Sequence, residues 1–177
     1  DVFMNLGVDG IISGGQTMNP STQDILEAVN KVPAETVYVL PNNKNIIMAA
    51  EQVDALTPKH VVVIPSKTVP QGITAMLSFN PDGTEEENTQ ALTEALAGVD
   101  TMQITYAARN SDFDGYDIHE GDYLAMHGSA LFGTSKDIKV LLRALAEKTR
   151  DDGKEFITIY YGEDIQEKHA QKAADLF

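Results

Sequence analysis

Three loops of this sequence carry side chains that could bind an anion. They read SGGQTMNPST at residues 13–22, PNNKN at 41–45 and PSKTVP at 65–70, and we call them together the polar loop edge. Each loop follows an apolar run and precedes a helix-like run. Helix N-termini in such positions attract phosphate and carboxylate groups, because their N–H groups are unpaired and the helix dipole is positive there. The first loop therefore raises the question of a phosphate site.

The residue types in these loops favour binding over catalysis. They supply hydroxyl, amide and ammonium groups, but no carboxylate or histidine that could act as a general base. We therefore predict no catalytic and no metal-ligating residue. The candidate residues for binding a ligand or a partner are Gly14, Gly15, Gln16, Thr17, Asn19, Ser21, Asn42, Asn43, Lys44, Ser66, Lys67 and Thr68.

The first loop does not match the known phosphate motifs. A P-loop requires GxxxxGK[ST], and GGQTMNPST lacks the second glycine and the lysine, while the dinucleotide fingerprint GxGxxG is also absent. A local role is the alternative: Gly14 and Gly15 turn the chain, and Ser21 or Thr22 caps the following helix. Nucleotide binding by this loop is disfavoured, and both a binding role and a capping role stay open.

Buried strands and amphipathic helices must position the three loops. Short apolar runs at 8–12, 36–40 and 60–64 predict parallel strands, and apolar residues at helical spacing predict helices over 22–32, 43–56 and 70–79. Because the carboxyl ends of parallel strands meet at one edge of a sheet, we expect the three loops to converge.

The order of elements changes at the turn NPDG near residue 80. We expect an acidic helix over 84–98, strands over 100–110 and 155–161, a hairpin over 121–126 and 130–133, and helices over 135–150 and 163–177. The predicted fold class is α/β. A parallel βαβ layer in a subdomain at 1–80 is followed by an α+β subdomain at 81–177 with a hairpin and two helices.

The charge balance narrows the classes of partner. The net charge is −14, from 27 acidic and 13 basic residues, which argues against nucleic acid or an anionic membrane surface as the main partner. Residues 81–177 carry −11 of this charge, either as a solvated face or as a docking surface for a basic partner.

No apolar run approaches the roughly 20 residues that a membrane span needs. The absence of cysteine excludes disulfides and is compatible with the cytoplasm.

One acidic motif resembles a calcium loop without matching it. Residues 112–117 read DFDGYD, but Gly115 is misplaced for an EF-hand and the distal glutamate is missing. We predict a solvated turn.

The ends of the sequence suggest a piece of a longer protein. It begins at Asp1 without a methionine and stops at Phe177 inside a predicted helix. We expect that a closing strand of the second subdomain lies beyond this end. Its loss would expose a sheet edge through which two copies could pair.

Several long blocks carry a family resemblance. GVDGIISGGQTMNPSTQDIL, VYVLPNNKNIIMAAEQ, VVVIPSKTVPQGITAML, EGDYLAMHGSALFGTSKD and ITIYYGEDI occur in this order over nearly the whole chain. They resemble the C-terminal, DegV-like region of the fatty acid kinase A family, the dihydroxyacetone-kinase-like proteins of the YloV type.

This resemblance implies a modular bacterial protein of the cytoplasm that acts in lipid metabolism. ATP and magnesium would bind an N-terminal domain outside these residues, so no cofactor is expected here. The region would dock a DegV-type B subunit, which carries the fatty acid that is phosphorylated to an acyl phosphate. By resemblance, Thr17, Ser21, Ser66 and Thr68 correspond to the hydroxyls that hold a lipid carboxylate in DegV-type proteins. A domain that itself binds a fatty acid or another small anion is the alternative, and an independent enzyme is disfavoured.

Overall fold

The chain folds into two compact units. The computed structural model describes residues 2–14, 18–113 and 115–177, and the units are Asp1–Thr101 and Met102–Phe177. The division therefore falls about 20 residues after the turn at residue 80 that the sequence suggested. The reason is the acidic helix that follows this turn, because its Leu92 and Leu96 pack with Ile64 and Ala75 of the first unit.

The first unit alternates helices with two strands. In chain order its elements are α1 (Val2–Asn5), α2 (Thr22–Lys31), β1 (Thr36–Val39), α3 (Lys44–Glu51), the 3-10 turn η1 (Asp54–Leu56), β2 (His60–Val63), α4 (Val69–Leu77) and α5 (Glu85–Ala97). The strands expected at 36–40 and 60–64 are confirmed, as are the helices expected at 22–32, 70–79 and 84–98. The helix expected over 43–56 is divided into α3 and η1.

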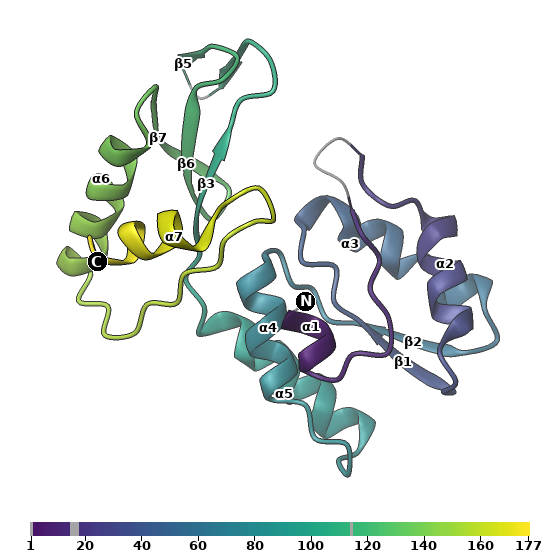
Figure 1. The fold of residues 1–177 in the computed structure, drawn as a ribbon. Helices are drawn as coiled ribbons and strands as arrows, with labels where there is room; N and C mark the ends of the chain where they lie inside the picture. The colour runs from purple at the N-terminus through teal and green to yellow at the C-terminus, as the bar shows by residue number, and fades with distance from the viewer. Residues whose placement is uncertain (1, 15–17, 114) are drawn as a thin grey trace. The chain divides into compact units, whose positions relative to one another are not determined.

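Strands β1 and β2 form a parallel sheet with helices on both faces (Figure 1). Their register pairs Thr36 with His60 and Val39 with Val63, so both strands end at the same edge. Side chains alternate between the faces because successive residues of a strand point in opposite directions. Val37 and Val61 pack against α2 and α3, and Ile64 packs in a second core with residues of α4 and α5.

The segment expected as a first strand, residues 8–12, is not a strand. No described residue pairs with it in a β-ladder, and Ile12 is the residue of the segment that packs against the core between α2, α3 and the sheet. Its apolar residues indicated burial correctly for Ile12, but burial of one side chain does not require strand pairing.

The second unit is built on an antiparallel sheet. Its elements are β3 (Met102–Tyr106), β4 (Ser111–Phe113), β5 (Tyr116–Ile118), β6 (Tyr123–His127), β7 (Ala130–Ser135), α6 (Ile138–Asp151) and α7 (Glu167–Ala174). The three main strands lie in the order β3–β6–β7, so the strand expected at 100–110, the hairpin after it and the helix expected at 135–150 are confirmed. Ala125 at the centre of the sheet packs against Leu141 and Leu145 of α6, and Phe177 joins this cluster.

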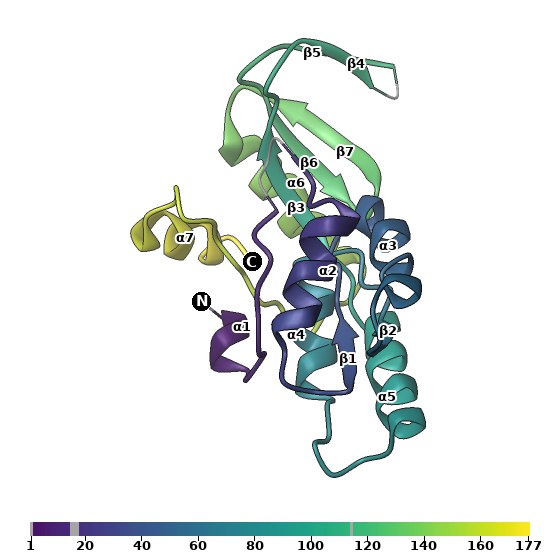
Figure 2. The ribbon, with the colours of Figure 1, turned by 90° about the vertical axis from the view of Figure 1, so that its right-hand side faces the viewer.

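A small hairpin, β4–β5, extends beyond the end of this sheet (Figure 2). Its turn includes Gly115, whose φ of 79° is in the left-handed region that glycine adopts without strain. The sequence predicted only a solvated turn at 112–117, and Asp114 lies outside the described residues. Strands β4 and β5 carry mostly exposed side chains, so their sequence contains no apolar run that would have predicted them.

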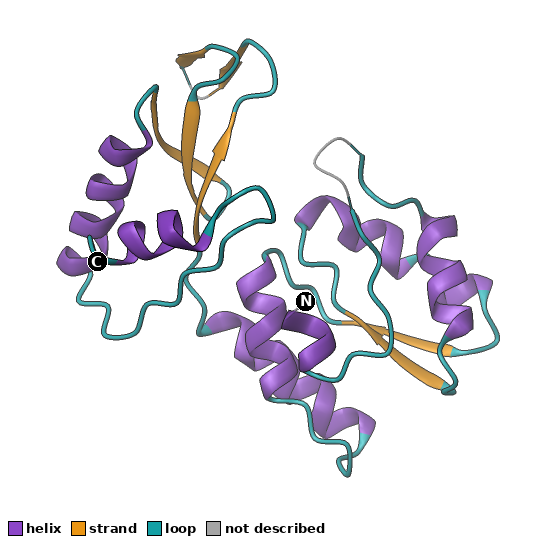
Figure 3. Ribbon diagram, viewed as in Figure 1, coloured by secondary structure: helices purple, strands orange, loops and turns teal. Residues whose placement is uncertain are grey.

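The segment expected as a strand at 155–161 is also irregular (Figure 3). It is rich in β-branched and aromatic residues, but none of the described strands pairs with it. The side chain of Phe156 is 93% exposed, and Tyr160 and Tyr161 are exposed as well. A strand needs a neighbouring segment whose backbone groups pair with its own, and the residue types of one segment do not supply that neighbour.

The predicted fold class is confirmed, since the structure is mixed α/β with one parallel and two antiparallel sheets among the described residues. None of the helices in the described ranges has the length and apolar character to cross a membrane.

Candidate functional site

The carboxyl edge of the β1–β2 sheet gathers two of the three polar loops. Because the strands are parallel and in register, the loops at 40–43 and 64–68 leave the sheet side by side. They lead into α3 and α4, whose N-terminal residues are Lys44 and Val69. Such an edge is where open α/β sheets bind ligands.

Asn42 and Ser66 join these two loops through a pair of hydrogen bonds. The backbone N–H of Asn42 donates to Ser66 Oγ at 2.9 Å, and Ser66 Oγ donates to Asn42 Oδ1 at 2.8 Å. The Ser66 side chain is 0% exposed. Ser66 therefore binds the neighbouring loop and does not reach the surface.

The N-terminus of α4 is capped by its own residues. Thr68 Oγ1 accepts a hydrogen bond from the Gln71 N–H at 3.3 Å, and Gln71 Oε1 accepts one from the Lys67 N–H at 2.8 Å. Thr68 Oγ1 also lies 2.9 Å from Thr101 Oγ1. The hydroxyl of Thr68 is thus engaged on two sides, whereas the Lys67 side chain is exposed.

The N-terminus of α3 connects to the first polar loop. Asn43 Oδ1 accepts a hydrogen bond from the Asn45 N–H at 2.9 Å, which caps the helix. Asn43 Nδ2 donates to Asn19 Oδ1 at 3.5 Å. This contact brings the end of the first loop to the same edge, where Lys44 is exposed as the first residue of α3.

The N-terminus of α2 carries a reciprocal capping box. Ser21 Oγ accepts from the Asp24 N–H at 3.2 Å, and Asp24 Oδ2 accepts from the Ser21 N–H at 2.8 Å and from its hydroxyl at 2.7 Å. The hydrogen bonds from the Ser21 side chain and backbone lower the pKa of the Asp24 carboxyl. Ser21 therefore performs the capping role that the sequence offered as an alternative.

Four further candidates lie in the first loop. Gly14 is exposed, and a Cβ there would lie 3.2 Å from Pro20 Cδ. Gly15, Gln16 and Thr17 fall outside the described residues. A depression among the described residues of the first loop combines apolar and polar side chains and is lined by Ile12, Ser13, Met18, Asn19, Pro20 and Asp24.

At the ends of β1 and β2 the polar loop edge therefore presents cations rather than a lined ligand cradle. Lys44 and Lys67 are exposed at the N-termini of α3 and α4, where the helix dipoles add positive potential. The hydroxyls of Ser21, Ser66 and Thr68 are used in caps and loop contacts. This chemistry suits an acidic surface or a carboxylate at the rim.

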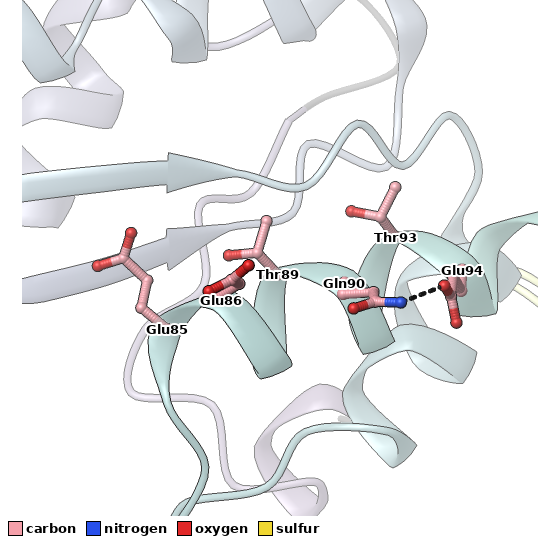
Figure 4. Close-up of a pocket in the computed structure, with 6 residues that line it drawn as sticks. All are labelled: Glu85, Glu86, Thr89, Gln90, Thr93 and Glu94. Atoms are coloured by element: carbon pink, nitrogen blue, oxygen red, sulfur yellow. Dashed lines mark hydrogen bonds between the residues drawn. The ribbon is translucent and has the colours of Figure 1, made fainter.

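A second depression lies along α5 (Figure 4). Its lining is acidic and polar: Glu85, Glu86, Thr89, Gln90, Thr93 and Glu94. Gln90 Nε2 donates to Glu94 Oε1 at 2.8 Å, as the dashed line shows.

Across the described ranges, no group of three or more histidine, aspartate and glutamate side chains is placed to hold a metal ion. The three glutamates of the α5 depression are exposed, as both interpretations of the acidic residues require, a solvated face and a docking surface for a basic partner.

Sequence reasoning missed two residues that shape the edge, Gly72 and Thr101. Gly72 is buried in the first turns of α4, and a Cβ there would lie 2.6 Å from Asn42 Cγ. A glycine inside a predicted helix is a recognisable signal of close packing, and it could have been used. Thr101 contacts Thr68, which lies 33 positions away in the sequence, and no local sequence pattern predicts such a contact.

Comparisons with known proteins relate the whole chain to one family and to one region of longer bacterial proteins. A family model that describes the C-terminal region of fatty acid kinase A-like (FakA-like) proteins matches residues 1–177. Protein YloV of Bacillus subtilis is 42% identical over 172 residues, which cover 97% of this chain and 31% of YloV. Uncharacterized protein SH1689 of Staphylococcus haemolyticus is 34% identical over 99% of this chain and 32% of its own length. Uncharacterized protein SAR1202 of Staphylococcus aureus is 34% identical over 94% of this chain and 30% of its own length. The chain thus spans about a third of the length of the curated relatives that it matches.

Proposed function

This chain belongs to the FakA-like C-terminal family of fatty acid kinases, and we propose that it docks a DegV-type, fatty-acid-carrying B subunit through the polar loop edge. ATP and magnesium would bind a different domain of the parent kinase, which would phosphorylate the acyl carboxylate that the docked protein presents. The module itself would contribute binding and orientation and no catalytic group. Since ATP is the proposed phosphoryl donor, we place the complex in the bacterial cytoplasm.

One observation carries the docking proposal: the edge exposes Lys44 and Lys67, while the candidate hydroxyls among its described residues are engaged in helix caps and loop contacts. Ser66 is buried against Asn42, and Thr68 caps α4 and contacts Thr101. A small carboxylate would need free donors converging on one point, and these hydroxyls do not supply them. Lys44 and Lys67, in contrast, are exposed and suited to acidic side chains on a protein surface.

Charge reversal of the two lysines tests this proposal. We expect the wild-type 177-residue chain to bind a purified oleate-loaded DegV-type protein in isothermal titration calorimetry. The double variant Lys44→Glu/Lys67→Glu should bind at least about tenfold more weakly. A carboxylate near a helix N-terminus is favourable to the helix, so the loss of affinity would not reflect unfolding.

Matched reversals on other elements serve as controls. Lys31→Glu in the last turn of α2 and Lys139→Glu at the start of α6 are tested singly and together; together they change the net charge by as much as the double variant does, and both lysines are exposed. Unchanged affinity in both controls supports docking at the polar loop edge. Absence of binding by the wild type, or an equal loss in the controls, would refute it.

Binding of a fatty acid or another small anion is the second candidate. The depression beside the first loop favours it, because Ile12 and Met18 place apolar surface next to Ser13 and Asn19. Such a combination could hold an acyl chain and its carboxylate. Native mass spectrometry and thermal shift with oleate decide the matter: no bound ligand and no shift would rule this candidate out.

A further inference from the structure

Asn42 adopts a backbone conformation that needs an explanation. Its φ is 56°, and within the described ranges it is the one residue other than glycine with a positive φ. Asparagine tolerates this left-handed conformation better than most residues, but it still costs free energy relative to an extended backbone. The surrounding contacts must therefore hold Asn42 in place.

Ser66 supplies one of these contacts from the neighbouring loop. It accepts a hydrogen bond from the Asn42 backbone and donates one to the Asn42 side chain, at 2.9 and 2.8 Å. Because the Ser66 side chain is fully buried, solvent does not compete for these two bonds. The left-handed turn at Asn42 brings both groups to the same hydroxyl.

Gly72 supplies the other contact from the first turns of α4. A Cβ on Gly72 would lie 2.6 Å from Asn42 Cγ and 2.8 Å from Nδ2, and closer still to Oδ1. The three atoms nearest to that position all belong to the Asn42 side chain. Glycine destabilises a helix interior relative to alanine, so its presence here is explained by the space that Asn42 occupies.

We infer that Asn42, Ser66 and Gly72 form a bracket that fixes the β1–α3 loop against the β2–α4 loop and so positions Lys44 and Lys67 for docking. Lys44 lies two residues after Asn42, and Lys67 follows Ser66 directly. Asn42 and Ser66, which the sequence suggested as contacts for a ligand or a partner, are on this account positioning residues. The positioning role rests on the proposed function, whereas the bracket itself does not.

A double-mutant cycle tests the bracket. Gly72→Ala should displace the Asn42 side chain, lower the melting temperature and speed amide hydrogen exchange at 41–45 and 65–68 by about tenfold or more. Asn42→Gly keeps the left-handed backbone and removes the side chain. In that background Gly72→Ala should be neutral or stabilising, because the atoms that it would contact are gone. Gly98→Ala is the control, since a Cβ there meets its nearest atom at 3.8 Å.

Affinity for the oleate-loaded DegV-type protein tests the positioning role. We expect Gly72→Ala to weaken binding about tenfold at a temperature where the variant is folded, and Ser66→Ala to weaken it in the same direction. Equal effects of Gly72→Ala in both backgrounds, or unchanged exchange in the two loops, would overturn the bracket. Unchanged affinity in a variant with faster loop exchange would overturn the positioning role. If the wild type does not bind the probe, the docking proposal and the positioning role fail together, while exchange and melting still decide the bracket.

Discussion

His60 Nε2 lies 2.9 Å from Glu85 Oε1, which ties the first residue of β2 to the first residue of α5. Asp54 of η1 faces the other ring nitrogen, with its Oδ1 3.5 Å from His60 Nδ1. The hydrogen bond to Glu85 is the main cause that raises the pKa of His60, and the charges of Glu85 and Asp54 act in the same direction. The imidazolium form is therefore favoured in the folded first unit.

This arrangement predicts a pH-dependent contribution to stability. A histidine whose pKa is raised by folding stabilises the folded state fully below its unfolded pKa of about 6.5, and the contribution disappears as the pH rises through the folded pKa. Glu85→Gln should therefore lower the melting temperature more at about pH 5.5 than at about pH 8.5. Because the side chains are largely exposed, we expect a difference of about 2 °C.

Glu86→Gln is the matched control for this measurement. Glu86 is exposed in the same turn of α5, and its carboxylate forms no ion pair with His60 among the described contacts. The control should show no such pH dependence. A larger loss for Glu85→Gln in the alkaline measurement than in the acidic one would contradict the account of this pair.

Asn88 should be a strong determinant of stability in the first unit. Its side chain is 3% exposed, and it binds Asn80 twice: Oδ1 accepts from the Asn80 N–H and Nδ2 donates to the Asn80 carbonyl, both at 2.8 Å. Asn88→Ala removes both bonds, so the Asn80 N–H loses its partner, while the Asn80 carbonyl still accepts from the Gly83 N–H at 3.0 Å. We expect a loss of about 2 kcal/mol in the free energy of unfolding, measured by urea denaturation. Thr93→Ala, at an exposed position of the same helix, should change it by less than about 0.5 kcal/mol. Comparable losses in the two variants would contradict this role.

The core of the second unit should depend on Leu145. This side chain of α6 is buried and packs against Ala125 of the sheet. Leu145→Ala should cost about 3 kcal/mol in the free energy of unfolding, because it removes buried methyl groups and leaves a cavity. Val140→Ala on the same helix is the control, since Val140 is 54% exposed and should cost below about 0.5 kcal/mol. Equal costs at the two positions would show that α6 does not pack as described.

Local sequence patterns predicted the elements that bury their own apolar residues. Strands β1 and β2 follow from the runs TVYVL and HVVVI, and α6 follows from leucines at helical spacing. The segments at 8–12 and 155–161 carry similar runs without forming strands. A strand is defined by pairing with a distant segment, and the apolar content of one segment does not specify that partner.

The candidate site was predictable in outline and not in detail. Parallel strands required the loops after β1 and β2 to meet, and their register fulfils this expectation. The direction in which each polar side chain points was not readable: Ser66 is buried, whereas the Lys67 side chain next to it is exposed. The local sequence around a small polar residue is the same whether its side chain is buried between two loops or exposed to solvent. The burial of Ser66 therefore depends on contacts with the neighbouring loop.

A hydrogen-exchange footprint would show whether the polar loop edge is the docking surface, as we propose. Exchange of the 177-residue chain would be followed with and without a saturating amount of the oleate-loaded DegV-type protein. We predict that the bound protein slows exchange at 41–45 and 65–69 and leaves α6 unchanged. Protection confined to α6 or to α5, or no protection anywhere, would contradict docking at the polar loop edge.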